Sequence, residues 1–217
     1  MAWIDQAQPT NWNQASVIAV CAYVLGCLTT GYYYVRLRTD QDIRDIGSGS
    51  VGARNVGRVL GWPAFWVTLV GDFAKGVVAV WVAQHFTTDY RLVALALIAV
   101  VVGHVWPAQL RFHGGKGIAT SLGGLLLYDY RLAFVFAVLF TGAFATLRRT
   151  VLPGLFAFAC LPLASMYMYW GPDRARVVAI SLLAGLILWT HRKNLGDELS
   201  QFLEHRNAHS KPNRHEL

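Results

Sequence analysis

Apolar residues gather into seven segments that are separated by polar connectors. The segments are approximately residues 16–35, 63–83, 92–110, 117–128, 132–147, 152–170 and 177–190. A helix of about 20 mostly apolar residues crosses a hydrocarbon core about 30 Å thick. The fourth segment is short and rich in glycine, which predicts a partial or tilted span. The pattern therefore predicts an all-α fold, a polytopic integral membrane bundle of about seven transmembrane helices.

The composition agrees with this pattern. Hydrophobic residues make up 55% of the chain and charged residues only 14%, whereas soluble domains carry about 25% charged residues. We expect a single domain over residues 1–217, with a polar tail from about residue 195. No basic stretch precedes the first apolar segment in MAWIDQAQPTNWNQ, so we expect that segment to be retained and not cleaved as a signal peptide.

The basic residues predict the orientation. With the N-terminus outside, the connectors and the tail on the inner side carry 14 Lys or Arg: Arg36, Arg38, Arg44, Arg54, Arg58, Arg111, Lys116, Arg148, Arg149, Arg192, Lys193, Arg206, Lys211 and Arg214. The outer connectors carry four, at Arg91, Arg131, Arg174 and Arg176. The positive-inside rule then places the N-terminus outside and the C-terminus in the cytoplasm. The net charge of +7 suits anionic lipids and substrates, and we expect no nucleic-acid partner.

The first polar motif is GSGSVGARNVGR, residues 47–58. Gly47, Gly49 and Gly52 spell the G-x-G-x-x-G dinucleotide fingerprint, but that fingerprint must follow a strand, and this one follows an apolar segment and a charged connector. The glycines instead favour an anion-binding nest of backbone N–H groups, to which Ser48, Asn55 and Arg58 add donors. On this stretch alone, a flexible loop that binds lipid headgroups is an equal alternative.

The second motif is HVWPAQLRFHGGKGIAT, residues 104–120. Gly114, Gly115, Lys116 and Gly117 come directly before an apolar helical segment, and a helix N-terminus of this kind favours phosphate binding. The stretch lacks the glycine and the Ser or Thr that a Walker A loop requires, so the sequence does not indicate ATP hydrolysis.

The third motif is HRKNLGDE, residues 191–198, which follows the last apolar segment. His191 and Asn194 are three residues apart and share one face of a continuing helix. A histidine that titrates near neutral pH can exchange protons. On this stretch alone, however, the favoured interpretation is a pair of interfacial residues that touch headgroups. Three polar motifs predicted on one membrane face together favour a functional role over this interpretation.

Together these stretches resemble the bacterial acyl-phosphate-dependent glycerol-3-phosphate acyltransferases, a polytopic membrane family. The family patterns Gly-Ser-Gly-Asn-x-Gly-Ala-Thr-Asn-x-x-Arg, Gly-His-x-x-Pro…Phe-x-Gly-Gly-Lys-Gly-x-Ala-Thr and His-Arg-x-Asn appear here as GSGSVGARNVGR, GHVWPAQLRFHGGKGIAT and HRKN. A further Asp-x-x-Lys-Gly pattern matches Asp72, Lys75 and Gly76. The chain departs from the family at Ser50, where Asn is usual, at Arg54, where Thr is usual, and in the tail LGDELSQFLEH.

The resemblance implies transfer of an acyl group from a long-chain acyl phosphate to the 1-hydroxyl of sn-glycerol 3-phosphate. The product is lysophosphatidic acid, made at the bacterial inner membrane in the first step of phospholipid synthesis, and a soluble enzyme that produces acyl phosphate is an implied partner. The implied catalytic residues are Ser48, Arg58, Lys116, His191 and Asn194. The implied substrate-binding residues are Gly47, Gly49, Gly52, Asn55, His104, Gly114, Gly115 and Gly117. No cofactor or metal is expected.

The residues alone leave open an alternative function for the protein and an alternative role for one charged pair. A transporter of a phosphorylated metabolite would also use basic, glycine-rich loops and charged residues inside a span. Asp72 and Lys75 lie three residues apart within an apolar segment, where unpaired charges are costly. They form either a structural ion pair, which we favour, or part of the lining of the site.

Overall fold

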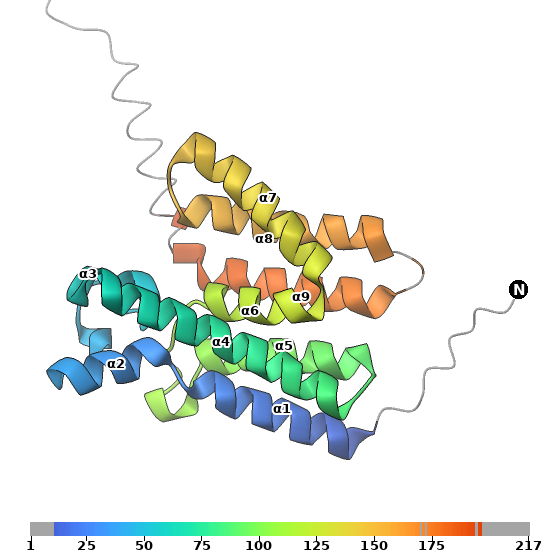
Figure 1. The fold of residues 1–217 in the computed structure, drawn as a ribbon, viewed down its shortest axis with the longest axis horizontal. Coiled ribbons are helices and arrows are strands. Elements are labelled where there is room, and N and C mark those ends of the chain that lie inside the picture. The colour runs from blue at the N-terminus through green and yellow to red at the C-terminus, as the bar shows by residue number, and fades with distance from the viewer. Residues whose placement is uncertain (1–10, 170, 172, 194, 197–217) are drawn as a thin grey trace, which may run out of the picture.

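The computed structural model describes residues 11–169, 171, 173–193 and 195–196, and every regular element in that part is a helix (Figure 1). The α-helices are α1 (Trp12–Cys27), α2 (Thr30–Thr39), α3 (Ala53–Leu60), α4 (Trp62–Phe86), α5 (Tyr90–Val105), α6 (Ile118–Tyr128), α7 (Tyr130–Leu147), α8 (Val151–Tyr169) and α9 (Arg174–Thr190). Two short 3₁₀ helices, η1 (Ile43–Asp45) and η2 (Ala108–Leu110), lie in the connectors. The predicted all-helical fold is confirmed.

Five stretches of the described chain are long and apolar enough to cross a membrane. They are Trp12–Thr39, Trp62–Phe86, Tyr90–Leu110, Tyr130–Leu147 and Val151–Tyr169. Helices α6, with 11 residues, and α9, with 17, are shorter. The seven predicted apolar segments therefore all contain helix, but the count of seven spans stays a prediction.

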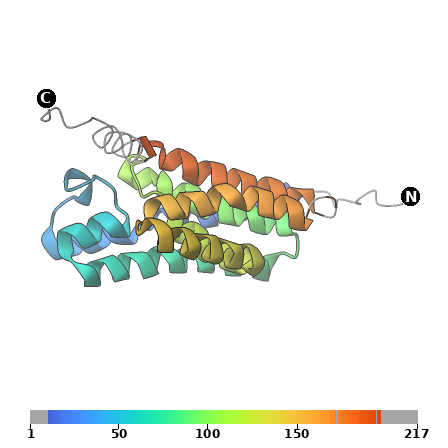
Figure 2. The same cartoon turned by 90° about the horizontal axis from the view of Figure 1, so that it is seen from above.

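The helices run along the long axis of the molecule in two packed groups (Figures 1 and 2). Helices α1, α4 and α5 form one group and α7, α8 and α9 the other, with α6 between them in contact with α4, α5 and α7. A continuous apolar core joins the groups through α5 and α9. At one end of the bundle, α2, η1, α3 and the start of α4 form a lobe with a small core of its own, made of Val35, Ile43, Val51, Val56, Ala64 and Leu110.

The first apolar segment differs from the uninterrupted helix that its sequence predicts. Helix α1 ends at Cys27 and α2 begins at Thr30. Two side chains of α4 reach the backbone at this break: Lys75 donates to the carbonyl of Gly26, and Asp72 accepts from the N–H of Thr30. Asp72 and Lys75 are buried and 3.1 Å apart. The favoured prediction of a structural ion pair is confirmed.

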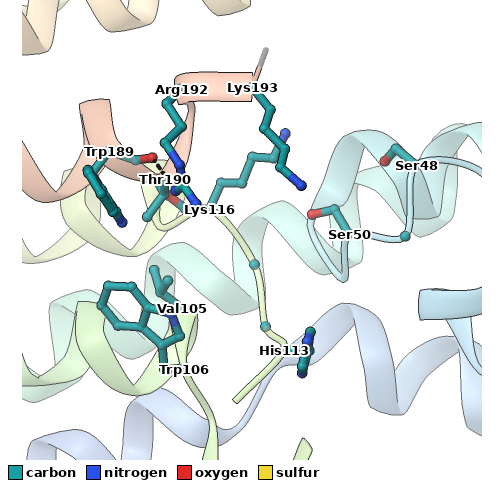
Figure 3. Close-up of a pocket in the computed structure, with 13 residues that line it drawn as sticks. Ser48, Ser50, Val105, Trp106, His113, Lys116, Trp189, Thr190, Arg192 and Lys193 are labelled. Atoms are coloured by element: carbon teal, nitrogen blue, oxygen red, sulfur yellow. Dashed lines mark hydrogen bonds between the residues drawn. The ribbon is translucent and has the colours of Figure 1, made fainter. Parts of the chain in front are cut away.

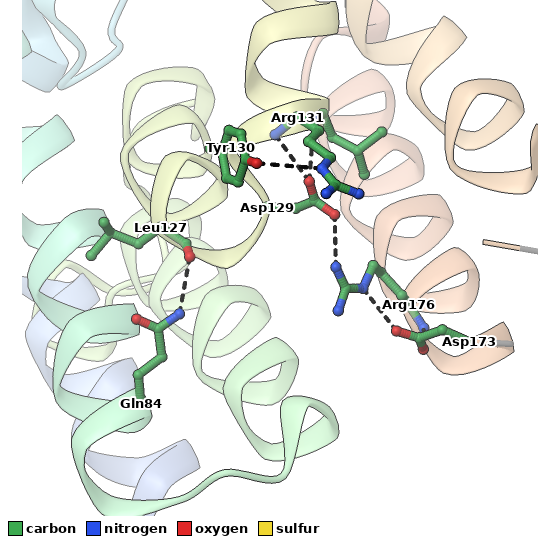
Figure 4. A network of polar contacts seen from close by, with 8 residues as sticks. Gln84, Leu127, Asp129, Tyr130, Arg131, Asp173 and Arg176 are labelled. Carbon is green, nitrogen blue, oxygen red and sulfur yellow. Dashed lines mark hydrogen bonds and ion pairs between the residues drawn. The ribbon is translucent and has the colours of Figure 1, made fainter. Parts of the chain in front are cut away.

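A second polar network fixes the opposite end of the bundle (Figure 4). Asp129, between α6 and α7, accepts from Arg176 Nη1 at 2.9 Å, and Arg176 Nε donates to Asp173 at 2.8 Å. Gln84 near the end of α4 donates to the carbonyl of Leu127 at 2.9 Å. The guanidinium of Arg176 also lies over the rings of Tyr90, Tyr128 and Tyr169. These contacts tie the end of the short helix α6 to α4 and α9.

Replacing Arg176 should destabilise the protein without damaging the far end of the bundle. The change Arg176→Met would leave the carboxylate of Asp129, only 2% exposed, without its charged partner. We expect a loss of about 3 kcal/mol, the lower end of the range for breaking a buried ion pair, measured as a lower midpoint of thermal unfolding in detergent. The neighbouring Arg131 is exposed, so Arg131→Ala is the control, and an equal effect of both changes would contradict the prediction.

Candidate functional site

The three polar motifs meet at the lobe end of the bundle, around a cavity of about 360 Å³ (Figure 3). The first motif contributes one wall, the second contributes the floor with the end of α5, and the residues after α9 complete the rim. The lining residues are Ser48, Gly49, Ser50, Val105, Trp106, His113, Gly114, Gly115, Lys116, Trp189, Thr190, Arg192 and Lys193. The three motifs, which the sequence predicts on one membrane face, thus lie around one cavity.

Asn55 organises the first motif from inside the protein. It is 2% exposed, and its Nδ2 donates to the carbonyls of Ile46 at 2.9 Å and Ser50 at 3.0 Å. Its Oδ1 accepts from the backbone N–H of Ser48 at 2.9 Å. Gly47 has a φ of +64°, and a Cβ there would overlap that same Oδ1. The amide of Asn55 is therefore occupied in shaping the loop that carries the two serines to the cavity.

The second motif is tied back to the end of α5. The N–H of Gly115 donates to the carbonyl of His104, and the N–H of Gly114 donates to that of Val105, each at 3.0 Å. A Cβ on Gly115 would overlap the imidazole of His104. These two N–H groups are thus used inside the protein, and the Lys116 side chain is the cationic group that this loop presents to the cavity (Figure 3).

The third motif brings His191 and Thr190 against the second motif. His191 is buried, and its Nδ1 lies 2.9 Å from the carbonyl of Ile187. Because a carbonyl only accepts, Nδ1 carries the proton, and the neutral ring keeps its lone pair on Nε2. The hydroxyl of Thr190 lies 2.9 Å from the carbonyl of Lys116, which joins the end of α9 to the lysine.

The electrostatic surroundings keep the imidazole of His191 neutral. Burial lowers the pKa of His191 below its ordinary value of 6.5, and the positive charges of Lys116 and Arg54 lower it further, against the opposing hydrogen bond to Ile187. Near neutral pH the ring is therefore a proton acceptor at Nε2 and not a cation.

Several predicted site residues lie outside the cavity lining. Arg58 is exposed on α3 and makes no hydrogen bond or ion pair within the described part of the chain. Gly47 lies in the first loop beside Asn55, and Gly52 and Gly117 are the N-cap residues of α3 and α6. His104 is 3% exposed and contacts Lys75. Asn194 is outside the described residues, as is nearly all of the polar tail.

The cavity also has lining residues that the sequence analysis did not single out. Trp106 and Trp189 form an apolar side, opposite the wall that carries Ser48 and Ser50 (Figure 3). Tryptophans at the ends of apolar segments are typical of the membrane interface, and that signal was present in the sequence. Arg192 and Lys193 add charge beside Lys116. A cavity with a cationic side and an apolar side fits an amphiphile with an anionic head.

Acidic residues, histidines and cysteines are dispersed. Within the residues that the structure describes, no three of them lie close enough together to hold a metal ion. The residues that line the cavity supply cations and hydroxyl groups, which suit phosphate.

The comparison with protein families decides the relationship. The family model described as Glycerol-3-phosphate acyltransferase matches residues 16–201. The chain belongs to this family. A protein of Desulfitobacterium hafniense named Glycerol-3-phosphate acyltransferase 1 is 42% identical over 185 residues, which cover 85% of this chain and 91% of the relative. One from Bacillus cereus with the same name is 38% identical over 170 residues, covering 78% and 90%.

Two solved structures have the same fold. Both are crystal structures of PlsY (YgiH), an integral membrane glycerol 3-phosphate acyltransferase, in a glycerol 3-phosphate form and a lysophosphatidic acid form. They superpose on this chain with TM-scores of 0.78 and 0.76 at 29% sequence identity, and each match covers 86% of this chain and 92% of the PlsY chain. The fold of this chain is thus that of an integral membrane enzyme family.

The pKa of His191 tests the electrostatic description of the site. Titration of the labelled imidazole by NMR should give a pKa below the ordinary 6.5, so the ring becomes charged only in acid. Removing a neighbouring positive charge with Arg54→Ala should raise this pKa, because the imidazolium is then repelled less. Arg58→Ala on the same helix is the control and should leave it unchanged. A pKa of 6.5 or above in the parent protein would refute the description.

Proposed function

We propose that this chain transfers an acyl group from a long-chain acyl phosphate to the 1-hydroxyl of sn-glycerol 3-phosphate. The products are lysophosphatidic acid and inorganic phosphate. Membership of the glycerol-3-phosphate acyltransferase family supports the acceptor and the reaction class. The observation that carries the proposal is the cavity itself, where Lys116 and Lys193 face a serine loop on one side and two tryptophans extend the wall on the other (Figure 3).

The cationic side suits the charge that develops during transfer. Attack of the acceptor hydroxyl on the acyl carbon places negative charge on the carbonyl oxygen and then on the leaving phosphate. Fixed donors aimed at such charge contribute about 3–4 kcal/mol each to lowering the barrier. We assign this role to Lys116, with Arg192 and Lys193 beside it on the rim. Ser48 is proposed to bind a substrate phosphate, and Arg58 to reach over the same phosphate from α3.

His191 is proposed to bind and orient the hydroxyl of the acceptor, glycerol 3-phosphate. Its Nε2 keeps a lone pair because Nδ1 is bonded to Ile187, so it can accept a hydrogen bond from the hydroxyl and orient it. Asn194, on the same helical face in the sequence, is proposed to assist. Acyl phosphate is already activated, and its own phosphate can take the proton as the carbon–oxygen bond to phosphate breaks.

A direct transfer fits these groups better than a covalent acyl-enzyme. The sequence has no G-x-S-x-G nucleophile elbow. Ser48 has its backbone N–H bound to Asn55, and His191 is proposed to orient the acceptor hydroxyl. We therefore assign Ser48 to binding, with the new ester bond formed in the same step that releases phosphate.

The location follows from the charge pattern of the sequence. We propose that residues 1–217 act as one domain in the bacterial inner membrane, with seven spans, the N-terminus outside and the cavity on the cytoplasmic face. The Arg and Lys residues of that face would meet anionic lipids. A soluble enzyme that produces acyl phosphate would then supply the donor from the cytoplasm.

The donor and the role of Lys116 can be tested together. Purified protein in lipid would receive labelled glycerol 3-phosphate with palmitoyl phosphate or with palmitoyl-CoA. We expect labelled lysophosphatidate from palmitoyl phosphate only. Lys116→Ala should lower the rate about 100- to 1,000-fold, as expected for loss of one fixed donor to developing charge.

Arg111→Ala is the matched control, because Arg111 is an exposed basic residue of the second motif that does not line the cavity. Product from palmitoyl-CoA alone would overturn the proposed donor. No product from either donor, with folded protein, would favour the transporter of a phosphorylated metabolite, to be examined by flux into vesicles.

A further inference from the structure

The break in the first apolar stretch leaves backbone groups that need partners. In a helix the carbonyls of the last turn and the N–H groups of the first turn have no partner of their own, and in hydrocarbon each unsatisfied group is costly. Here the carbonyls at the end of α1 are those of Gly26, Cys27 and Leu28. The N–H of Thr30 opens α2. Gln109 donates to the carbonyl of Cys27, and the others turn toward α4.

Lys75 and Asp72 of α4 satisfy both ends of the break. The Lys75 ammonium lies 3.1 Å from the carbonyl of Gly26 and 3.0 Å from that of Leu28. The carboxylate of Asp72 lies 3.3 Å from the N–H of Thr30. A cation at the C-terminus of α1 and an anion at the N-terminus of α2 also match the two helix dipoles. The ion pair thus caps both helix ends at the break: Lys75 caps the C-terminus of α1, and Asp72 caps the N-terminus of α2.

The same ammonium reaches the second motif through His104. Nζ of Lys75 lies 2.7 Å from Nδ1 of His104. Lysine is only a donor, so Nδ1 accepts, and the neutral imidazole carries its proton on Nε2. That edge of the ring lies against Gly115, whose N–H is bonded to the carbonyl of His104. Displacing His104 would therefore displace the loop that presents Lys116.

The pair reaches the first motif through α2. Asp72 holds the N-terminus of α2 at Thr30. The next residue, Gly31, packs so closely on the carbonyl of Val51 that a Cβ would overlap it. Val51 is buried in the core of the lobe and directly follows Ser50, which lines the cavity. The direction of α2 therefore sets the place of the serine loop.

We propose that Lys75, together with Asp72, is a positioning residue that holds the two phosphate-binding loops in register with each other. It touches no substrate: it fixes the break between α1 and α2 on one side and His104 on the other. This inference rests on the proposed acyltransferase function. Loss of the pair should lower the rate of the chemical step, because a small misplacement of the reacting groups lowers the rate more than it lowers substrate binding.

The test uses a variant in which no buried charge is left unpaired. Lys75→Met alone would strand the carboxylate of Asp72, so the decisive protein is the double variant Asp72→Asn with Lys75→Met, in full-length protein in lipid. The change Asp72→Asn retains an oxygen for the N–H of Thr30, so the double variant can keep that hydrogen bond while it loses both charges. In the double variant we expect kcat per folded protein to fall about 10- to 100-fold, with KM for glycerol 3-phosphate within about threefold.

A spectroscopic readout separates positioning from general destabilisation. In the parent, ¹⁵N NMR of His104 should show an unprotonated Nδ1 and a protonated Nε2, and the double variant should lose this preference. Thr68→Val is the matched control on α4: Thr68 is fully buried and its hydroxyl has no partner among the described residues. Its kcat and the His104 signal should match those of the parent.

The other outcomes overturn the proposal. An unchanged kcat in the double variant would show that the loops need no such support. A raised KM with unchanged kcat would make Lys75 a substrate-binding group, and recovery of only aggregated protein would assign the pair to folding alone. An inactive parent enzyme would instead be a failure of the proposed function, which the parent control in each assay identifies.

Discussion

The structure depends on one constraint: a polar site must be built inside a bundle whose helices are long and apolar enough to span a membrane. Backbone groups at membrane depth need partners within the protein, yet the first apolar stretch is interrupted between Cys27 and Thr30. The buried pair of Asp72 and Lys75 satisfies the interruption from α4. Because the helix is interrupted, α2 can run in a different direction from α1 and form the lobe at the end of the bundle. The lobe supplies one wall of the cavity.

Buried polar residues shape the loops of the site, and other residues line the cavity. Asn55 and His104 use their polar atoms on the protein, and each shapes a glycine-rich loop. The polar groups that line the cavity include the hydroxyl of Ser48, the ammonium of Lys116 and the rim cations. His191 is buried next to the cavity and is not one of its lining residues; one of its ring nitrogens is bonded to the carbonyl of Ile187, and the other keeps its lone pair. Such fixed, preorganised donors suit a reaction in which charge moves onto phosphate.

Much of this arrangement could be predicted from the sequence. The apolar segments predicted the helices, and the basic residues predicted that three glycine- or charge-rich stretches lie on one face of the bundle. The break in the first stretch was missed because hydropathy averages over the residues around Leu28 and no proline marks it. The roles of Asn55 and His104 were assigned to substrate, because a single sequence does not distinguish a polar residue that binds ligand from one that binds backbone. Asn55 bonds to the backbone of its own loop, and His104 contacts Lys75 of another helix.

The central claim is that the cavity between the loops is a phosphate site whose main cation is Lys116. Calorimetric titration of glycerol 3-phosphate into the protein in lipid nanodiscs tests this claim without any assumption about the donor. Binding should be absent for glycerol and weaker by at least about tenfold in Lys116→Ala, since a charge-assisted hydrogen bond contributes about 1.5–3 kcal/mol. Equal affinity in the parent and in Lys116→Ala would contradict the account.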